Sequence, residues 1–251
     1  MINRPLQNRV PLPDGTVLET GAGTFEIISF MHPGGAALIY QAQEEGQMYP
    51  VVLKEYFPGW GYVRAGAAVL PEDAAALPEN SRERADAIEA MKKLFDGRAA
   101  REVRVGQEVR QRTRLTVSAE RQLEVRSIRL PGEDPVTPPY CCILKMECLT
   151  ERQGFWLKDL LKEAARPCSP EHPFGNGLQN RRSAVPQFSR TVELFCALLA
   201  NLKRIHGDKG GSGCIHGDIS AGNVFVDGSL SDGTVLGVSL LDFGGGLDAE
   251  S

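Results

Sequence analysis

Three polar residues near the end of the chain have the types and the spacing that a magnesium-nucleotide site requires. Asn223 follows Asp218 by five residues, and two strand-like runs, 224–226 and 238–241, separate it from Asp242. Mg²⁺ prefers oxygen ligands and keeps waters and phosphate oxygens, so an amide oxygen and a carboxylate are a suitable protein contribution. We therefore predict that Asn223 and Asp242 bind Mg²⁺, which leaves Asp218 to accept a proton.

The same residue types also favour turns, which is the alternative explanation of this stretch. The motifs occur in a fixed order along the chain: His216-Gly217-Asp218, then Asn223, then Leu241-Asp242-Phe243-Gly244. Together they resemble the catalytic loop and the metal-binding loop of the protein-kinase-like superfamily. The resemblance implies that the protein binds ATP with Mg²⁺ and transfers the γ-phosphoryl group to a hydroxyl.

A lysine lies inside an apolar run that is predicted to form a strand. Lys54 follows two valines and a leucine, and a buried ammonium group is costly unless an opposite charge meets it. The run 52–58, Val-Leu-Lys-Glu-Tyr-Phe-Pro, is similar to bacterial members of the serine/threonine kinase-like group. There the lysine contacts the α- and β-phosphates and pairs with a helix glutamate. The alternative is an edge-strand lysine that faces water.

Helical spacing of apolar residues begins after this strand. The pattern predicts a helix from Arg82 through Val109, with Gly97 as a candidate break. By the resemblance, Glu102 on this helix is the partner of Lys54, and Glu108 is the alternative. Lys54, Glu102 and Asp218 are thus the expected catalytic residues.

A glycine-bearing turn precedes the lysine. Strands are predicted at 24–30 and 38–42, with the turn at 31–37, and Gly34 and Gly35 would let backbone amides approach phosphate oxygens. The turn departs from the kinase pattern, since only Gly34 falls in register. A plain Pro-Gly-Gly hairpin turn accounts for these residues equally well.

The adenine-binding segment follows from the same resemblance. Residues 121–130 and 140–146 are predicted strands, and the second leads into Met146-Glu147-Cys148-Leu149. Met146 would be the gatekeeper. The backbone groups of Glu147 and Leu149 would meet the adenine edge.

These elements imply an α+β fold of the two-lobe kinase type. Residues 1–23 are expected to be a loose lead-in that could lie against the domain. Residues 24–146 would form a β-rich N-lobe with one main helix and an irregular insertion at about 59–85, which holds one short helical turn. Residues 147–251 would form the hinge and a partial, mostly helical C-lobe, with a short helix at 156–163, a loop at 165–184 and a long helix at 185–205 that ends near His206 and Gly207.

The chain stops shortly after the Asp-Phe-Gly segment, where a full C-lobe would continue with further helices. We expect either a fragment or minimal form, or a protein partner that covers the incomplete C-lobe. A net charge of -4 argues against nucleic-acid binding. No apolar run is long enough to span a membrane and no signal peptide is evident, so a cytoplasmic location is expected. The six cysteines form no C-x-x-C pair and are expected to be buried thiols, and the four histidines lack zinc-ligand spacing.

Three functions stay open at this point. The first is a protein serine/threonine kinase, which the segment around Lys54 and the hinge residues favour. The second is a small-molecule kinase of the aminoglycoside phosphotransferase-like group, where Gly217 also follows the histidine. The third is a pseudokinase or nucleotide-binding module without transfer activity, which the poor glycine pattern favours.

Overall fold

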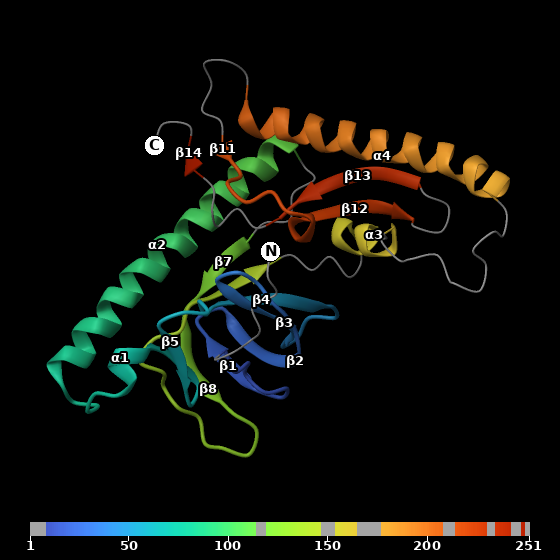
Figure 1. The fold of residues 1–251 in the computed structure, drawn as a ribbon. Coiled ribbons are helices and arrows are strands. Elements are labelled where there is room, and N and C mark those ends of the chain that lie inside the picture. Colours follow the sequence, from blue (N-terminus) through green and yellow to red (C-terminus); the bar gives the residue numbers. More distant parts are fainter. Residues whose placement is uncertain are drawn as a thin grey trace. The chain divides into compact units, whose positions relative to one another are not determined.

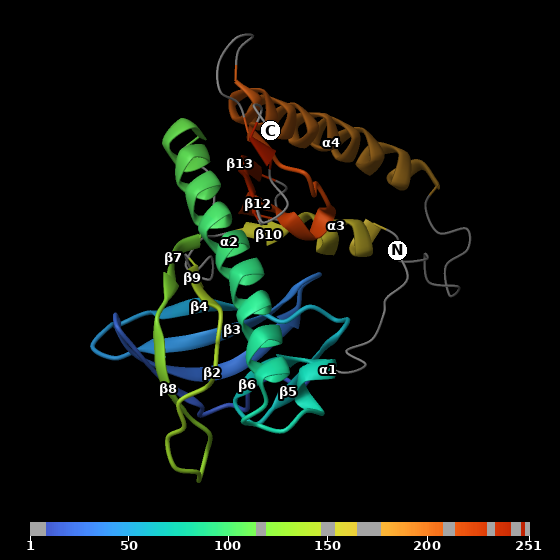
Figure 2. The same cartoon turned by 90° about the vertical axis from the view of Figure 1, so that its left-hand side faces the viewer.

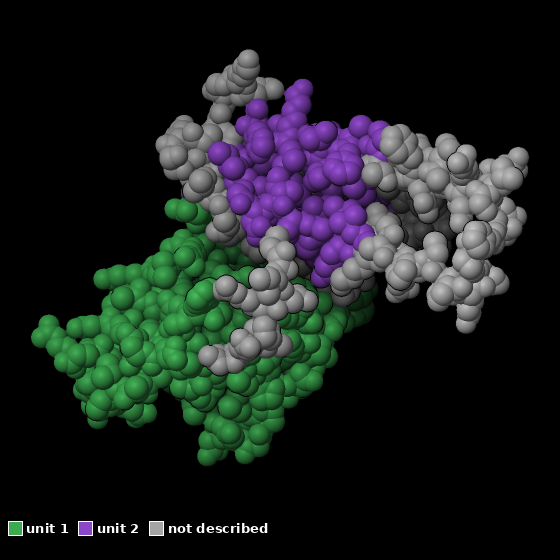
Figure 3. Space-filling model, viewed as in Figure 1, with its two compact units in different colours: residues 1–103, 119–148 green, residues 104–118, 149–251 purple. Residues whose placement is uncertain are grey.

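The computed structural model describes residues 9–113, 119–146, 154–164, 177–207, 214–229, 234–241 and 247–248. The chain divides into two compact units, which Figure 3 colours separately. Unit 1 comprises residues 1–103 and 119–148, and unit 2 comprises residues 104–118 and 149–251.

Seven strands of unit 1 form one antiparallel sheet in the order β7-β9-β4-β3-β2-β1-β8 (Figure 1). Their bounds are β1 (Val17–Thr20), β2 (Gly23–Pro33), β3 (Ala37–Glu44), β4 (Pro50–Tyr56), β7 (Ala119–Leu123), β8 (Val125–Arg129) and β9 (Ile143–Met146). The predicted strand at 121–130 is therefore two strands with Glu124 between them, and the last strand begins three residues later than predicted. Strand β4 lies inside the sheet, between β3 and β9.

Side chains of β4 alternate between two hydrophobic cores. Val51 and Leu53 pack in one core, and Val52 and Tyr56 pack in the other. Because successive side chains of a strand point to opposite faces, Lys54 shares its face with Tyr56, and Glu55 shares its face with Leu53. The alternation decides which core each charged residue must enter.

The long helix α2 (Arg82–Thr113) begins at the predicted residue and runs 32 residues without a break at Gly97. Figure 2 shows its first part lying along the sheet of unit 1. Met91, Phe95 and Ala99, four residues apart, are buried there in one core with Tyr56 and Leu144. Glu102 follows Ala99 by three residues and so lies on the same face of the helix.

The insertion is more regular than predicted. Residues 62–71 form a hairpin of β5 (Tyr62–Ala65) and β6 (Ala68–Pro71), followed by the short helix α1 (Glu72–Ala75), which is the expected helical turn. Gly66 in the hairpin turn has a φ of 58°, a left-handed conformation that suits glycine. Alternating apolar residues were too few here to reveal strands of four residues each.

The expectation of a loose lead-in is wrong for the residues just before 24. Strand β1 pairs with both β2 and β8, so it is an internal strand of the sheet. Leu12, which precedes it, is 1% exposed and belongs to the core. The Pro and Gly residues around this segment favoured the prediction of a loop. The strand β1 is short, and its partner β8 is more than a hundred residues away in the sequence.

Unit 2 contains a three-stranded antiparallel sheet in the order β10-β12-β13. Its elements are β10 (Gly154–Trp156), α3 (Leu157–Ala164), α4 (Gly177–His206), β11 (Cys214–Ile215), η1 (Ala221–Asn223), β12 (Val224–Ser229), β13 (Thr234–Leu240) and β14 (Leu247–Asp248), and β11 pairs with β14. Helix α4 packs Leu194 and Leu198 against Val238 and Leu240 of β13. The core also takes Val105 from the last part of α2.

Two predictions for unit 2 have opposite outcomes. Residues 177–184 are helical, so the predicted loop at 165–184 is wrong there, and 165–176 lie outside the described residues. The helix ends at His206 as predicted, where Gly207 has a φ of 73°.

Both units combine helices with antiparallel strands, which confirms the α+β class. Among the described cysteines, Cys142 and Cys214 are buried as predicted, whereas Cys196 is exposed. None of the described helices is both long enough and apolar enough to span a membrane.

Candidate functional site

Lys54 is buried on an internal strand. Its neighbours across the sheet are Ile39 on β3 and Leu144 on β9, and the residue is 6% exposed. This burial excludes the alternative of an edge-strand lysine that faces water. An ammonium group in such a place requires an anionic partner and several acceptors.

Helix α2 supplies the partner. The Nζ of Lys54 lies 2.8 Å from Oε1 and 3.0 Å from Oε2 of Glu102, and Glu102 is 1% exposed. The hydroxyl of Tyr56, on the same face of β4, donates to Glu102 Oε2 at 2.7 Å. Both carboxylate oxygens therefore accept hydrogen bonds, which is the condition under which a buried ion pair is tolerated.

Glu108, the alternative partner, belongs to unit 2. It lies 3.4 Å from Arg104 Nη1 and accepts from the thiol of Cys214 at 3.5 Å. Helical geometry explains the difference, because six residues turn the side chain by about 600°, and Glu108 thus leaves the face on which Ala99 and Glu102 lie. The helical spacing of the buried residues Met91, Phe95 and Ala99 indicates which face of α2 meets the sheet, and Glu102 lies on that face.

Gly34 and Gly35 lie in the turn of residues 34–36, which we call the glycine turn. It is shorter than predicted, because β2 continues to Pro33, and Gly34 N donates to Ala37 O at 2.8 Å. Both glycines are described, and neither has a φ in the left-handed region. A Cβ at Gly35 would meet no atom within 4 Å. Neither the backbone conformation nor the packing requires glycine at residue 35. The space beside its backbone is open.

The predicted adenine-side residues are only partly described. Met146 ends β9 opposite Val52 of β4 and Ala119 of β7, and it is 8% exposed. Its side chain belongs to the core that α2 covers. Glu147 and Leu149 lie outside the described residues.

In unit 2, a short loop orients Asp218. The amide of Asn223 donates from Nδ2 to Asp218 O at 2.9 Å and to Asp218 Oδ2 at 3.3 Å. Asp218 is exposed, whereas Asn223 is half-buried in η1. Gly217, just before the aspartate, has a φ of 76°, which a residue with a side chain rarely adopts.

A buried histidine fixes this loop. His216 is fully buried, its Nε2 lies 2.8 Å from Leu241 O, and its Nδ1 accepts from Asp218 N at 3.3 Å. Since Nδ1 accepts, the proton of a neutral ring stands on Nε2 and is donated to Leu241 O. Leu241 N also donates to Asn223 O at 2.9 Å, so the backbone just before residue 242 is tied to the loop of Asp218.

The donor set suits a hard cation as far as it is described. Asn223 uses its Nδ2 for Asp218, and within the described residues its Oδ1 accepts no hydrogen bond, which leaves an amide oxygen for Mg²⁺. Asp242 lies outside the described residues. In the described part of the chain, no cluster of three His, Cys, Asp or Glu residues forms a metal site.

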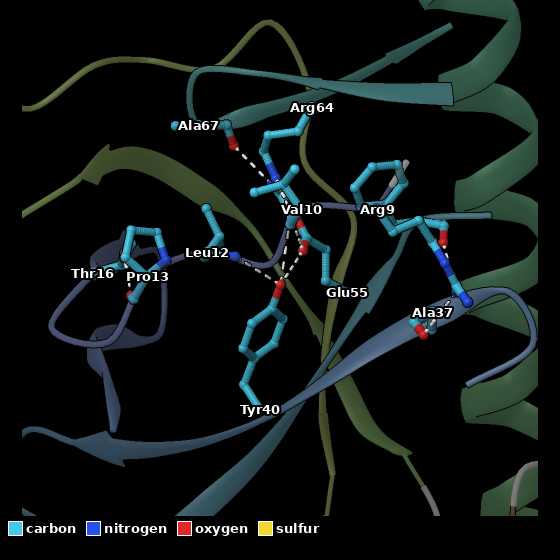
Figure 4. A network of polar contacts seen from close by, with 11 residues as sticks. Arg9, Val10, Leu12, Pro13, Thr16, Ala37, Tyr40, Glu55, Arg64 and Ala67 are labelled. Carbon is cyan, nitrogen blue, oxygen red and sulfur yellow. Dashed lines mark hydrogen bonds and ion pairs between the residues drawn. The ribbon is translucent and has the colours of Figure 1, made fainter. Parts of the chain in front are cut away.

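A second buried charge cluster was missed in the sequence. Arg64 of β5 donates to Glu55 through Nη1 at 2.7 Å and Nη2 at 2.6 Å, and Tyr40 donates to Glu55 Oε2 at 2.8 Å (Figure 4). Burial raises the pKa of Tyr40, and the Glu55 carboxylate raises it further. A glutamate inside an apolar strand, next to Lys54, was the signal that could have revealed the cluster.

Comparison with protein-family models and with curated proteins gives no match. Among solved structures, the one described as PpkA-294 apo form matches with a TM-score of 0.52 and 17% identity, over 94% of this chain and 62% of its own. The PknI kinase domain of Mycobacterium tuberculosis matches with a TM-score of 0.50 and 14% identity, over 94% of this chain and 62% of its own. The chain therefore has a protein-kinase-like fold and spans 62% of the length of each of these structures.

Proposed function

We propose that this protein is an ATP-dependent phosphotransferase of the serine/threonine kinase-like type, which transfers the γ-phosphoryl group of Mg-ATP to a hydroxyl. The observation that carries the proposal is the buried contact of Lys54 with Glu102, which Tyr56 completes. Apolar residues in these places would give a core of equal or greater stability, since a buried ion pair rarely adds to the stability of the fold. The pair therefore favours a functional reason for the charge.

In this proposal, Lys54 binds the phosphates of the nucleotide. Glu102, which Tyr56 holds through a hydrogen bond, keeps the ammonium group at one point on the sheet, so little reorganisation is needed when an anion arrives. The glycine turn that contains Gly34 and Gly35 brings the backbone amide of Gly35 to the phosphate oxygens, while the amide of Gly34 donates to Ala37 O and holds the turn. Met146 borders the base, and the backbones of Glu147 and Leu149 bind its edge.

The loop in unit 2 handles the acceptor hydroxyl. Asp218 accepts its proton or orients it, and the amide of Asn223 keeps the carboxylate in place. Asn223 and Asp242 hold Mg²⁺, which neutralises charge on the phosphates when it is bound. His216 and Asn223 both bond to the backbone of Leu241, the residue that precedes Asp242.

The acceptor is either a protein serine or threonine or a small hydroxyl compound. The loop residue Gly217 is compatible with both classes. Incubation of the protein with Mg-ATP and either a mixture of protein substrates or a panel of small alcohols and amino sugars would separate the two.

The test of the proposal is Asp218→Asn. The substitution keeps the shape of an exposed side chain, so folding and Mg-ATP binding should be unchanged, whereas transfer should fall by roughly 10²-fold or more because the proton acceptor is gone. Calorimetric binding and transfer of labelled γ-phosphate measure the two effects. Full transfer activity in the variant would remove Asp218 from the reaction.

The same assay tests the nucleotide-binding module. Wild-type protein that binds Mg-ATP but transfers no phosphate to any acceptor would favour a module without transfer activity. Wild-type protein that binds no nucleotide would overturn the proposed function altogether.

A further inference from the structure

Arg9 reaches the glycine turn from the start of the described chain. Its Nη1 lies 2.9 Å from Gly34 O, 3.3 Å from Ala37 O and 3.2 Å from Phe57 O. Figure 4 shows the side chain of Arg9 extended toward Ala37. One cationic nitrogen thus joins both sides of the glycine turn to the residue that follows β4.

Few other hydrogen bonds order this turn. Gly34 N donates to Ala37 O, and Phe57 N donates to Ala36 O at 3.0 Å. A turn that contains two successive glycines loses much backbone entropy when it is fixed. A charge-assisted hydrogen bond to its carbonyls is therefore an effective way to keep one conformation.

Arg9 is itself held in place by the elements around Lys54. The carbonyl of Val10 accepts from Arg64 Nε at 2.9 Å, and Leu12 N donates to the hydroxyl of Tyr40 at 3.1 Å. Arg64 and Tyr40 both bind Glu55, which is the residue after Lys54. Figure 4 shows this sequence of contacts. The position of Arg9 is thereby linked through side chains to the strand that carries the lysine.

We propose that Arg9 is a positioning residue that holds the glycine turn in the conformation that receives nucleotide phosphates. The inference rests on the proposed function and adds a group from outside its catalytic motifs. Arg9 acts through the carbonyls of the turn. Its guanidinium holds the carbonyls of Gly34 and Ala37, and the amide of Gly35, which donates to no acceptor within the described residues, remains to meet an anion.

Three variants separate the charge of Arg9 from its stem. Arg9→Met keeps the apolar length and removes the donors, whereas Arg9→Lys keeps a cationic nitrogen with three N–H donors, where Nη1 of arginine has two for its three carbonyl contacts. Arg129→Met is the control, because Arg129 is an exposed arginine on β8 in the same unit. The three changes have similar size and differ in their contacts with the turn.

Amide hydrogen exchange of the nucleotide-free protein tests the first half of the inference. Arg9→Met should speed exchange of the amides of Gly34 and Phe57 by roughly tenfold, the factor that loss of a charge-assisted hydrogen bond typically produces. Arg9→Lys should restore most of the protection, and Arg129→Met should leave it unchanged. Unchanged exchange in Arg9→Met would overturn the positioning role.

Binding of ATP and of adenosine tests the second half. Arg9→Met should weaken Mg-ATP binding roughly tenfold and leave adenosine binding unchanged, because only ATP has phosphates for the turn to meet. Unchanged ATP affinity, or an equal loss for adenosine, would overturn the inference. Wild-type protein that binds neither compound would instead refute the proposed function, and the exchange result would still decide whether Arg9 orders the turn.

Discussion

At the scale of single residues, the ion pair of Lys54 and Glu102 is one in which removal of either charge should destabilise the fold. Both are almost fully buried, and the carboxylate takes three short contacts, two from Lys54 and one from Tyr56. Removal of one charge leaves the other desolvated and unmatched. The cost of such a loss exceeds the net stability that the pair contributes.

The variant Glu102→Gln tests this burial. It should lower the free energy of unfolding by about 3 kcal/mol, because the amide keeps the shape and leaves the ammonium group of Lys54 without a counter-charge. Urea unfolding measures the change. Asp86→Asn is the matched control, since the Arg82–Asp86 pair is 3.7 Å long and largely exposed. The control substitution should change the free energy of unfolding by no more than about 0.5 kcal/mol. Equal losses in the two variants would contradict the assigned burial energy.

At the scale of elements, α2 decides which glutamate meets the lysine. The buried positions 91, 95 and 99 continue to 102 at helical spacing, and this periodicity selects Glu102 over Glu108. The start of α2 at Arg82 was predictable for the same reason. Gly97 did not break the helix, because packing on either side of an exposed position outweighs one unfavourable propensity.

Short strands limited the prediction of the fold. Strand β1 and the β5–β6 hairpin contain four-residue strands, in which alternation of apolar residues is too brief to recognise. The contacts of Arg9 were out of reach for another reason. They join a side chain to carbonyls 25 to 48 residues away, and backbone acceptors leave no trace in residue types. Lys54 was recognisable because a charge in an apolar run is unusual.

Two glycines with equally open surroundings test the backbone at this scale. A Cβ would meet nothing within 4 Å at Gly97 in α2 or at Gly66 in the hairpin, but only Gly66 has a positive φ. Gly97→Ala should therefore raise the free energy of unfolding by about 0.5–1 kcal/mol through the lower entropy of the unfolded chain. Gly66→Ala should lower it by about 1 kcal/mol because alanine resists the left-handed region. Thermal unfolding of both variants measures the difference, and shifts of the same sign would contradict it.

At the scale of the whole molecule, the folded state of unit 1 favours the neutral, protonated form of a buried thiol and a tyrosine hydroxyl. Burial raises the pKa of the Cys142 thiol from 9.0 to about 12, and the nearby Asp96 and Glu102 carboxylates contribute in the same direction, against a hydrogen bond from Tyr140. Burial also raises the pKa of Tyr140, as does its hydrogen bond to Asp96 at 2.8 Å. In the unfolded chain these groups return to their ordinary values. The folded state therefore binds more protons than the unfolded state above about pH 9.

This difference in proton binding fixes how stability depends on alkaline pH. Each group with a raised pKa contributes stability that is fully present below its unfolded pKa and is lost as pH rises toward its folded pKa. Because Cys142 spans 9.0 to about 12, the free energy of unfolding should fall above pH 9, with a slope that approaches about 1.4 kcal/mol per pH unit for this thiol alone. Urea unfolding midpoints between pH 8 and pH 11 measure the slope. In Cys142→Ala the slope should become shallower although the protein at pH 8 is less stable, since a small cavity replaces the thiol. A slope identical to that of the wild type would show that Cys142 does not carry the alkaline loss.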